Sequence, residues 1–118
     1  MAVKTFTAGE NLTGKLGYAV IASSTNKQVI LADDANDVCL GILTNDNTSG
    51  NPVALALPGE VCKVNLGGAV DFGGELKAAD GGTLVAAGGT GDDKVIAKAL
   101  EDGASGDLIY AVVMNFIK

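Results

Sequence analysis

Two clusters of carboxylate and amide side chains are the parts of this sequence whose residue types and spacing could do chemistry. Asp33, Asp34, Asn36 and Asp37 lie within "DDAND", and Asp46 stands between two asparagines in "TNDN". Oxygen ligands at this density could hold a calcium ion. The order of an EF-hand loop is absent, however, and such clusters between apolar runs are typical of turns, because Asp and Asn side chains bond their own backbone. We favour turns and keep a calcium-dependent interaction module as an alternative.

The residues of the common catalytic sites are missing or wrongly ordered. The chain has no histidine, which removes the Ser-His-Asp and Cys-His arrangements and the commonest zinc ligand. Cys39 and Cys62 do not have the spacing of a zinc motif. The stretch "AAGGTGDDK" lacks the order of a phosphate-binding loop, and a carboxylate pair for glycoside hydrolysis would have no Trp surface to hold a sugar. We therefore expect no enzyme, no cofactor and no metal.

Charge and apolar patterning argue against nucleic acids and membranes as partners. All eight basic residues are lysines, and the formal net charge is −6. Nucleic-acid binding needs cations at the phosphates and favours arginine for reading bases. The opening "MAVKTFTAGE" lacks the pattern of a secretory signal, and no run approaches the roughly 18 apolar residues of a membrane helix. We expect a soluble protein made in the cytoplasm.

Few large side chains are available for a core. The 118 residues include 17 glycines, three Phe, two Tyr and no Trp. Because burial stabilises a fold by roughly 25 cal/mol per Å² of apolar area, a small domain of this kind needs disulfides, metals or oligomerisation. Cys39 and Cys62 stand alone in apolar runs and are expected to be free and buried. Oligomerisation is therefore the expected source of support.

Short apolar or alternating runs recur between Gly, Asn, Asp and Ser clusters, which indicates an all-β fold. We expect one small β domain over residues 1–118, a barrel or a sandwich, with at most one short helix near residues 94–100. The predicted strands are Val3–Thr7, Tyr18–Ala22, Val29–Leu31, Cys39–Leu43, Val53–Leu57, Val61–Val64, Leu76–Ala78, Leu84–Ala86, Val95–Leu100 and Leu108–Ile117.

The chain resembles itself at a shift of 56 residues. Between positions 17 and 57 this shift gives seven identities, among them Gly17 with Gly73 and Ser49-Gly50 with Ser105-Gly106. The pattern predicts an internal two-fold repeat, in which two similar β units pack together. The alternative is that any small β protein repeats strand and turn at this spacing.

The last predicted strand, "LIYAVVMNFI", is apolar at nearly every position and does not alternate. Such a strand must be covered on both faces. One face can meet the core, and the other can meet a partner subunit or, alternatively, the rest of the same core. Tyr110, Met114 and Phe116 are the candidate residues of a subunit interface.

Longer patterns resemble a known family. The segments "TFTAGENLTGKLGYAVI", "CLGILTNDNTSGNPVALALPGEVCKV", "GGELKAADGGTLVAA" and "VIAKALEDGASGDLIYAVVM" look like the small capsid decoration proteins of tailed phages, the cement or head-fibre-like proteins. The resemblance implies an all-β protein, commonly a homotrimer, on the outer capsid surface of the virion. It also implies that the major capsid protein is the partner and that the role is to reinforce contacts between its subunits.

Within that resemblance, residues 1–13 are the candidate capsid-contacting arm. Val3 and Phe6 would be apolar anchors and Lys4 a charge partner, although an ordinary first strand explains the same residues. A different role for the same fold is a carbohydrate-binding or adhesin-like module. Such a module would gather exposed aromatic residues and polar loops at one end of the barrel, and Tyr18, Phe72 and Tyr110 are the residues available for it.

Overall fold

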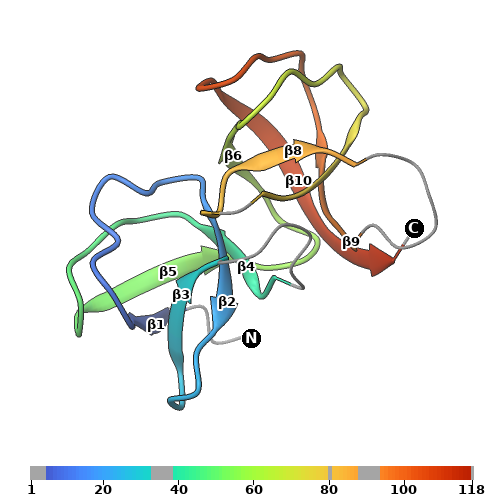
Figure 1. Ribbon diagram of the computed structural model, residues 1–118. Coiled ribbons are helices and arrows are strands. Elements are labelled where there is room, and N and C mark those ends of the chain that lie inside the picture. The colour runs from blue at the N-terminus through green and yellow to red at the C-terminus, as the bar shows by residue number, and fades with distance from the viewer. Residues whose placement is uncertain (1–4, 33–38, 80, 88–93, 118) are drawn as a thin grey trace.

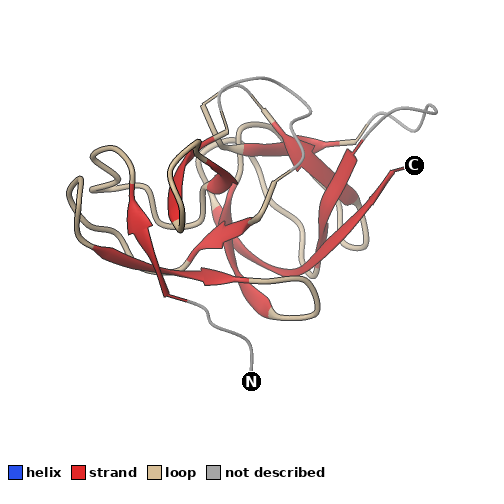
Figure 2. Ribbon diagram, turned by 90° about the horizontal axis from the view of Figure 1, so that it is seen from below, coloured by secondary structure: helices blue, strands red, loops and turns tan. Residues whose placement is uncertain are grey.

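The structure is a computed structural model in which residues 5–32, 39–79, 81–87 and 94–117 are described. The described residues form strands and loops, with no helix among them (Figures 1 and 2). The strands are β1 (Thr5–Ala8), β2 (Ala19–Ala22), β3 (Gln28–Leu31), β4 (Gly41–Leu43), β5 (Pro52–Ala56), β6 (Val61–Asn65), β7 (Glu75–Ala78), β8 (Leu84–Ala86), β9 (Lys94–Ala99) and β10 (Leu108–Ile117). The predicted all-β class and its ten strands are confirmed.

The short helix considered for residues 94–100 is wrong. This segment forms β9, which lies between β10 and β7 in one sheet. Ala97 is opposite Val113 on one side and Leu76 on the other, both in antiparallel register. A central strand satisfies its backbone donors and acceptors through both neighbours, and this tertiary pairing overrides a weak local preference for helix.

The first half of the chain closes into a small barrel. Its strand order is β1-β3-β2-β4-β5, and β1 completes the cycle. Thr7 of β1 is opposite Gln28 of β3 in a parallel pair, and Phe6 is opposite Val53 of β5 in an antiparallel pair. Small and branched side chains fill the interior, namely Ala8, Leu12, Val20, Val29, Leu43, Val53 and Leu55.

The second half forms a five-stranded sheet in the order β6-β10-β9-β7-β8. The four neighbouring pairs in this order are all antiparallel. Leu66, directly after β6, makes an isolated parallel bridge to Leu84 of β8. The sheet therefore curls almost into a barrel, with a seam between β6 and β8 that one bridge spans.

The two halves share one topology. β2 and β7 begin at Ala19 and Glu75, and β5 and β10 begin at Pro52 and Leu108, in both cases 56 residues apart. Each of β1 to β5 corresponds to the strand five places later in the chain. The barrel pairs β3–β2, β2–β4, β4–β5 and β5–β1 thus correspond to the pairs β8–β7, β7–β9, β9–β10 and β10–β6 of the second sheet. The parallel pair β1–β3 corresponds to the bridge at the seam.

Hydrogen bonds repeat with the same spacing. The N–H of Gly17 donates to Leu43 O (2.9 Å), and the N–H of Gly73 donates to Ala99 O (2.8 Å). Both glycines are left-handed, with φ of 82° and 83°. A residue with a Cβ rarely adopts this conformation, which explains why glycine is identical in the two copies. The predicted internal repeat is confirmed at the level of single hydrogen bonds.

The halves are joined through a shared buried cluster. Ala19, Ile42 and Ala56 of the barrel strands belong to the same cluster as Val64 and Ile96 of the second sheet. Main-chain bonds also cross between the halves, from the N–H of Ala19 to Gly82 O (2.7 Å) and from the N–H of Asn65 to Gly17 O (2.9 Å). Figure 1 shows the barrel and the second sheet side by side.

Candidate interaction surface

The final strand is apolar on both sides but buried on one. In β10 the side chains of Ile109, Ala111 and Val113 are buried, whereas Tyr110 is 51% exposed and Met114 is half-buried. Alternating side chains of a strand point to opposite faces of the sheet, so one apolar face covers the core and the other points outward. The prediction that this strand carries two apolar faces is therefore correct.

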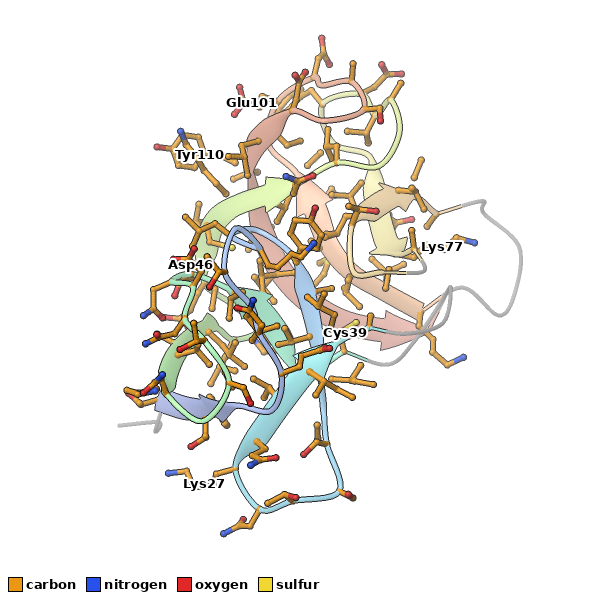
Figure 3. All side chains as sticks on the ribbon, turned by 60° about the vertical axis from the view of Figure 1, so that its left-hand side comes forward. Lys27, Cys39, Asp46, Lys77, Glu101 and Tyr110 are labelled. Carbon is orange, nitrogen blue, oxygen red and sulfur yellow. The ribbon has the colours of Figure 1, made fainter. Side chains whose placement is uncertain are left out.

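Two charged side chains contact Tyr110, one at its backbone and one at its ring. Its N–H donates to a carboxylate oxygen of Glu101 (2.8 Å), and Lys63 Nζ lies 5.2 Å from the centre of its ring. Lys63 is opposite Tyr110 in the β6–β10 pair. Figure 3 shows the Tyr110 side chain pointing away from the sheet beneath Glu101. A tyrosine ring offers a large contact area at a low cost in conformational entropy, which suits it to an interface.

Further apolar side chains surround Tyr110 on the outward side of the second sheet. Leu108 is 48% exposed and Val61 is 59% exposed. We call this surface the β6–β10–β9 face, and its members are Val61, Lys63, Lys98, Leu100, Leu108, Tyr110, Val112 and Met114. Contiguous exposed apolar side chains bordered by charges are typical of an interaction site.

A hollow of about 270 Å³ lies at the border of this face. Residues of both halves line it, including Leu16 and Leu43 from the first and Cys62, Lys63 and Leu108 from the second. Its lining is largely apolar, so it could take an apolar side chain of a binding partner.

The burial of Cys62 differs from the prediction. Neither cysteine is part of a disulfide, and Cys39 is buried as expected, but Cys62 is only half-buried. Burial of the thiol, together with the nearby negative charge of Glu60, raises the pKa of Cys62 to about 11. The thiolate is the reactive form, so Cys62 is a weak nucleophile at neutral pH.

The candidate capsid and subunit residues fall partly outside the described ranges. Val3 and Lys4 lie outside them, and so does the side chain of Phe116, whose backbone pairs with Val95. Phe6 is half-buried and packs against the barrel core, where it also lines a hollow of about 380 Å³ beside the β2–β3 hairpin. Tyr110 and Met114 lie on the outward side of β10.

The acidic clusters have a structural explanation where they are described. The "DDAND" cluster lies outside the described residues. Asp46 accepts a hydrogen bond from the N–H of Gly14 (2.8 Å), and in the repeat Asp102 accepts one from the N–H of Phe72 (2.7 Å). Among the described residues, no group of three or more His, Cys, Asp or Glu side chains is placed to hold a metal ion. That part of the chain also contains no helix capable of crossing a membrane.

The three aromatic residues considered for sugar binding have different surroundings. Tyr18 is half-buried, with Lys15 Nζ 5.0 Å from its ring centre. Phe72 is 70% exposed in the loop between β6 and β7. Tyr110 belongs to the β6–β10–β9 face.

Sequence reasoning missed Leu108, Val61, Leu100 and the lysines of this face. The signal was present in the repeat. At the 56-residue shift, Thr44, Pro52 and Ala54 of the first half align with Leu100, Leu108 and Tyr110 of the second. A comparison of the aligned positions for size and polarity would have identified the apolar face.

The fold defines a small duplicated all-β protein with an apolar sheet face on one copy of its repeat. No family model matches the chain, and no curated protein matches its sequence. Among solved structures, the N base of head fiber gp8.5 in bacteriophage phi29 is similar in fold to this chain, with a TM-score of 0.72 and 21% sequence identity. The match covers 92% of this chain and 90% of that chain, so both halves of the repeat are included. The resemblance to phage head proteins is thus confirmed at the level of the fold.

Proposed function

We propose that this protein is a structural component of a tailed-phage head. It binds the outer surface of the capsid and stabilises contacts between major capsid protein subunits. The observation that carries the proposal is the fold match to the head fiber base of phi29 along nearly the full length of both chains. Fold similarity alone does not transfer a function, so the proposal also depends on the surface of this chain.

The surface supports an associating role. Large apolar side chains on the β6–β10–β9 face remain in water in the single chain. The net charge of −6 suits a protein that stays outside a DNA-filled shell, since it would be repelled by phosphates. The chain is proposed to act as one domain over residues 1–118.

The mechanism we propose is multivalent stapling. Each subunit of a homotrimer makes a weak contact with the major capsid protein, and three contacts made together gain through their high effective concentration. Opening the shell then requires several contacts to break at once. The capsid contacts are assigned to the N-terminal arm, with Val3, Lys4 and the exposed part of Phe6.

Co-sedimentation with expanded, undecorated phage heads tests this function. Stoichiometric binding that saturates supports it, and a Val3→Ser/Lys4→Glu variant is expected to bind more weakly. The matched control is Lys77→Glu, which makes the same charge change on β7 of the second half, away from β1. A folded protein that ignores heads and binds sugars on a glycan array would overturn the proposal in favour of a carbohydrate-binding module.

A further inference from the structure

We propose that the β6–β10–β9 face is the surface on which a second copy of this chain docks. The inference rests on the proposed function and deepens it by naming the surface that joins the subunits. Its basis is the duplication, because one backbone unit occurs twice in the chain with different side chains.

At the exposed positions of this unit, the second copy has larger apolar side chains than the first. Lys63 is opposite Tyr110 in the second half, as Thr5 is opposite Ala54 in the first. The N–H of Leu100 donates to Tyr110 O (2.9 Å), as the N–H of Thr44 donates to Ala54 O (2.9 Å). The positions Thr44, Pro52 and Ala54 are therefore occupied by Leu100, Leu108 and Tyr110 in the second half.

The first half shows that the fold does not need large apolar residues at these places. Its Thr44 and Pro52 are exposed and polar or small, and its barrel is nevertheless complete. Leu108 also lines the hollow between the two halves, but Leu100 and Tyr110 add exposed apolar area without belonging to a buried cluster. Their placement points to a contact outside the chain.

In the first half, the corresponding face already contacts the other unit of the chain. Ile42 of β4 and Ala56 of β5 are buried in the cluster that the barrel shares with the second sheet. Their counterparts at the 56-residue shift are Lys98 and Val112, which are exposed and half-buried. This side of the unit thus contacts another copy of the unit in the first half and is uncovered in the second. A second chain supplies the missing unit.

The contact within the chain indicates the geometry of the contact between chains. Ile42 and Ala56 of the first unit are buried in one cluster with Val64, which belongs to a different surface of the second unit. The same contact between two chains is heterologous, and heterologous contacts that close form rings such as the proposed trimer. Lys98 is opposite Glu75, so the face carries both signs of charge, and a second carboxylate at position 98 would weaken the contact.

Native mass by light scattering over a dilution series tests the inference. The test variant is Leu108→Ser/Tyr110→Ser, and the matched control is Pro52→Ser/Ala54→Ser at the equivalent positions of the first half. We expect the wild type and the control to form trimers of the 11.7 kDa chain, and the test variant to be monomeric at the same concentrations. Circular dichroism verifies that each variant is folded. A second variant, Lys98→Glu, alters only charge at an exposed site and is expected to raise the dissociation constant at least about tenfold at low salt, with less effect at high salt.

The outcomes separate this inference from the proposed function. A folded test variant and a Lys98→Glu variant that both remain trimeric would overturn the inference while leaving head binding intact. A monomeric wild type whose head binding is lost in the test variant would also overturn it, because the capsid would then cover the face. If the wild type is a trimer that the test variant dissociates, the inference holds, even if neither protein binds heads and the proposed function fails.

Discussion

Gly17 and Gly73 provide an internal experiment on how the halves are joined. The two glycines have nearly equal φ and donate equivalent hydrogen bonds. A Cβ added at Gly17 would lie 2.8 Å from Asn65 N and 2.9 Å from Leu108 Cδ2, whereas a Cβ at Gly73 would meet nothing within 4 Å. Substitution by alanine therefore imposes the same backbone strain at both sites and a steric clash at only one.

The magnitudes follow from this difference. Left-handed alanine costs about 1–2 kcal/mol, and the lower entropy of the unfolded chain returns about 0.4–1 kcal/mol. Gly73→Ala should thus lose about 1 kcal/mol. At Gly17 the added methyl meets the main chain of β6, so the overpacking cost of about 1–3 kcal/mol applies in addition. Gly17→Ala should lose roughly 2–4 kcal/mol in total.

Urea unfolding followed by circular dichroism measures both values. It should be done at a concentration where the two variants have the same native mass, because Leu108 also belongs to the proposed subunit interface. Equal losses for Gly17→Ala and Gly73→Ala would refute the reasoning, since they would mean that the barrel and β6 do not approach each other as closely as described.

Four further predictions concern Cys62, Gly41 and the equivalent carboxylates Asp46 and Asp102. In a Cys39→Ala background, the rate of maleimide labelling of Cys62 should keep rising up to about pH 11, whereas a thiol of ordinary pKa, 9.0, would level off earlier; the Glu60→Gln variant should shift the profile to lower pH. The folded thiol keeps its proton to higher pH than the unfolded one. Its contribution to the free energy of unfolding is therefore complete below pH 9 and is lost as the pH rises through about 11. In Cys62→Ala the melting temperature should consequently depend less on pH in this range. Gly41→Ala should destabilise by about 1–3 kcal/mol in urea, because its Cβ would lie 2.5 Å from Ala56 O, and a loss below a few tenths would contradict the close β4–β5 approach. Asp102→Ala and Asp46→Ala should each lower the free energy of unfolding by about 1 kcal/mol, because each removes the acceptor of a backbone N–H. A calcium chelator should leave the melting temperature of the wild type unchanged, and a marked fall with chelator would instead support a calcium site.

The strands could be predicted because turn chemistry is local. Gly50 and Gly106 have φ of 85° and 90°, and each precedes the closing strand of its half. Such residues can be read from the sequence without knowing what the strands pair with. The repeat was visible for the same reason, since left-handed glycines are among the few positions where both copies require one residue type.

The closure of one half and the seam of the other could not be predicted. They depend on register. Lys63, rather than Val61, takes the place of Thr5 opposite the closing strand, so β6 is displaced by two residues from the 56-residue shift. Side-chain alternation has a period of two, so this displacement leaves the pattern of inward and outward residues unchanged and is invisible in the sequence.

The candidate site was predicted in part. Tyr110 and Met114 stood out because β10 lacks alternation, and both lie on its outward side. Val61 and Lys63 did not stand out, because a short strand with mixed polarity looks like an ordinary surface strand. Only pairing with Tyr110 and Val112 shows that they belong to the same face.

The seam between β6 and β8 gives the two halves unequal resistance to opening. In the barrel every strand has a neighbour on both sides, so no strand can leave without breaking two ladders. β8 is held by its ladder with β7 and by the single bridge at Leu84. Amide protons of β8 should consequently exchange with solvent earlier than those of β3, its counterpart, which makes the second half the place where the native molecule opens first.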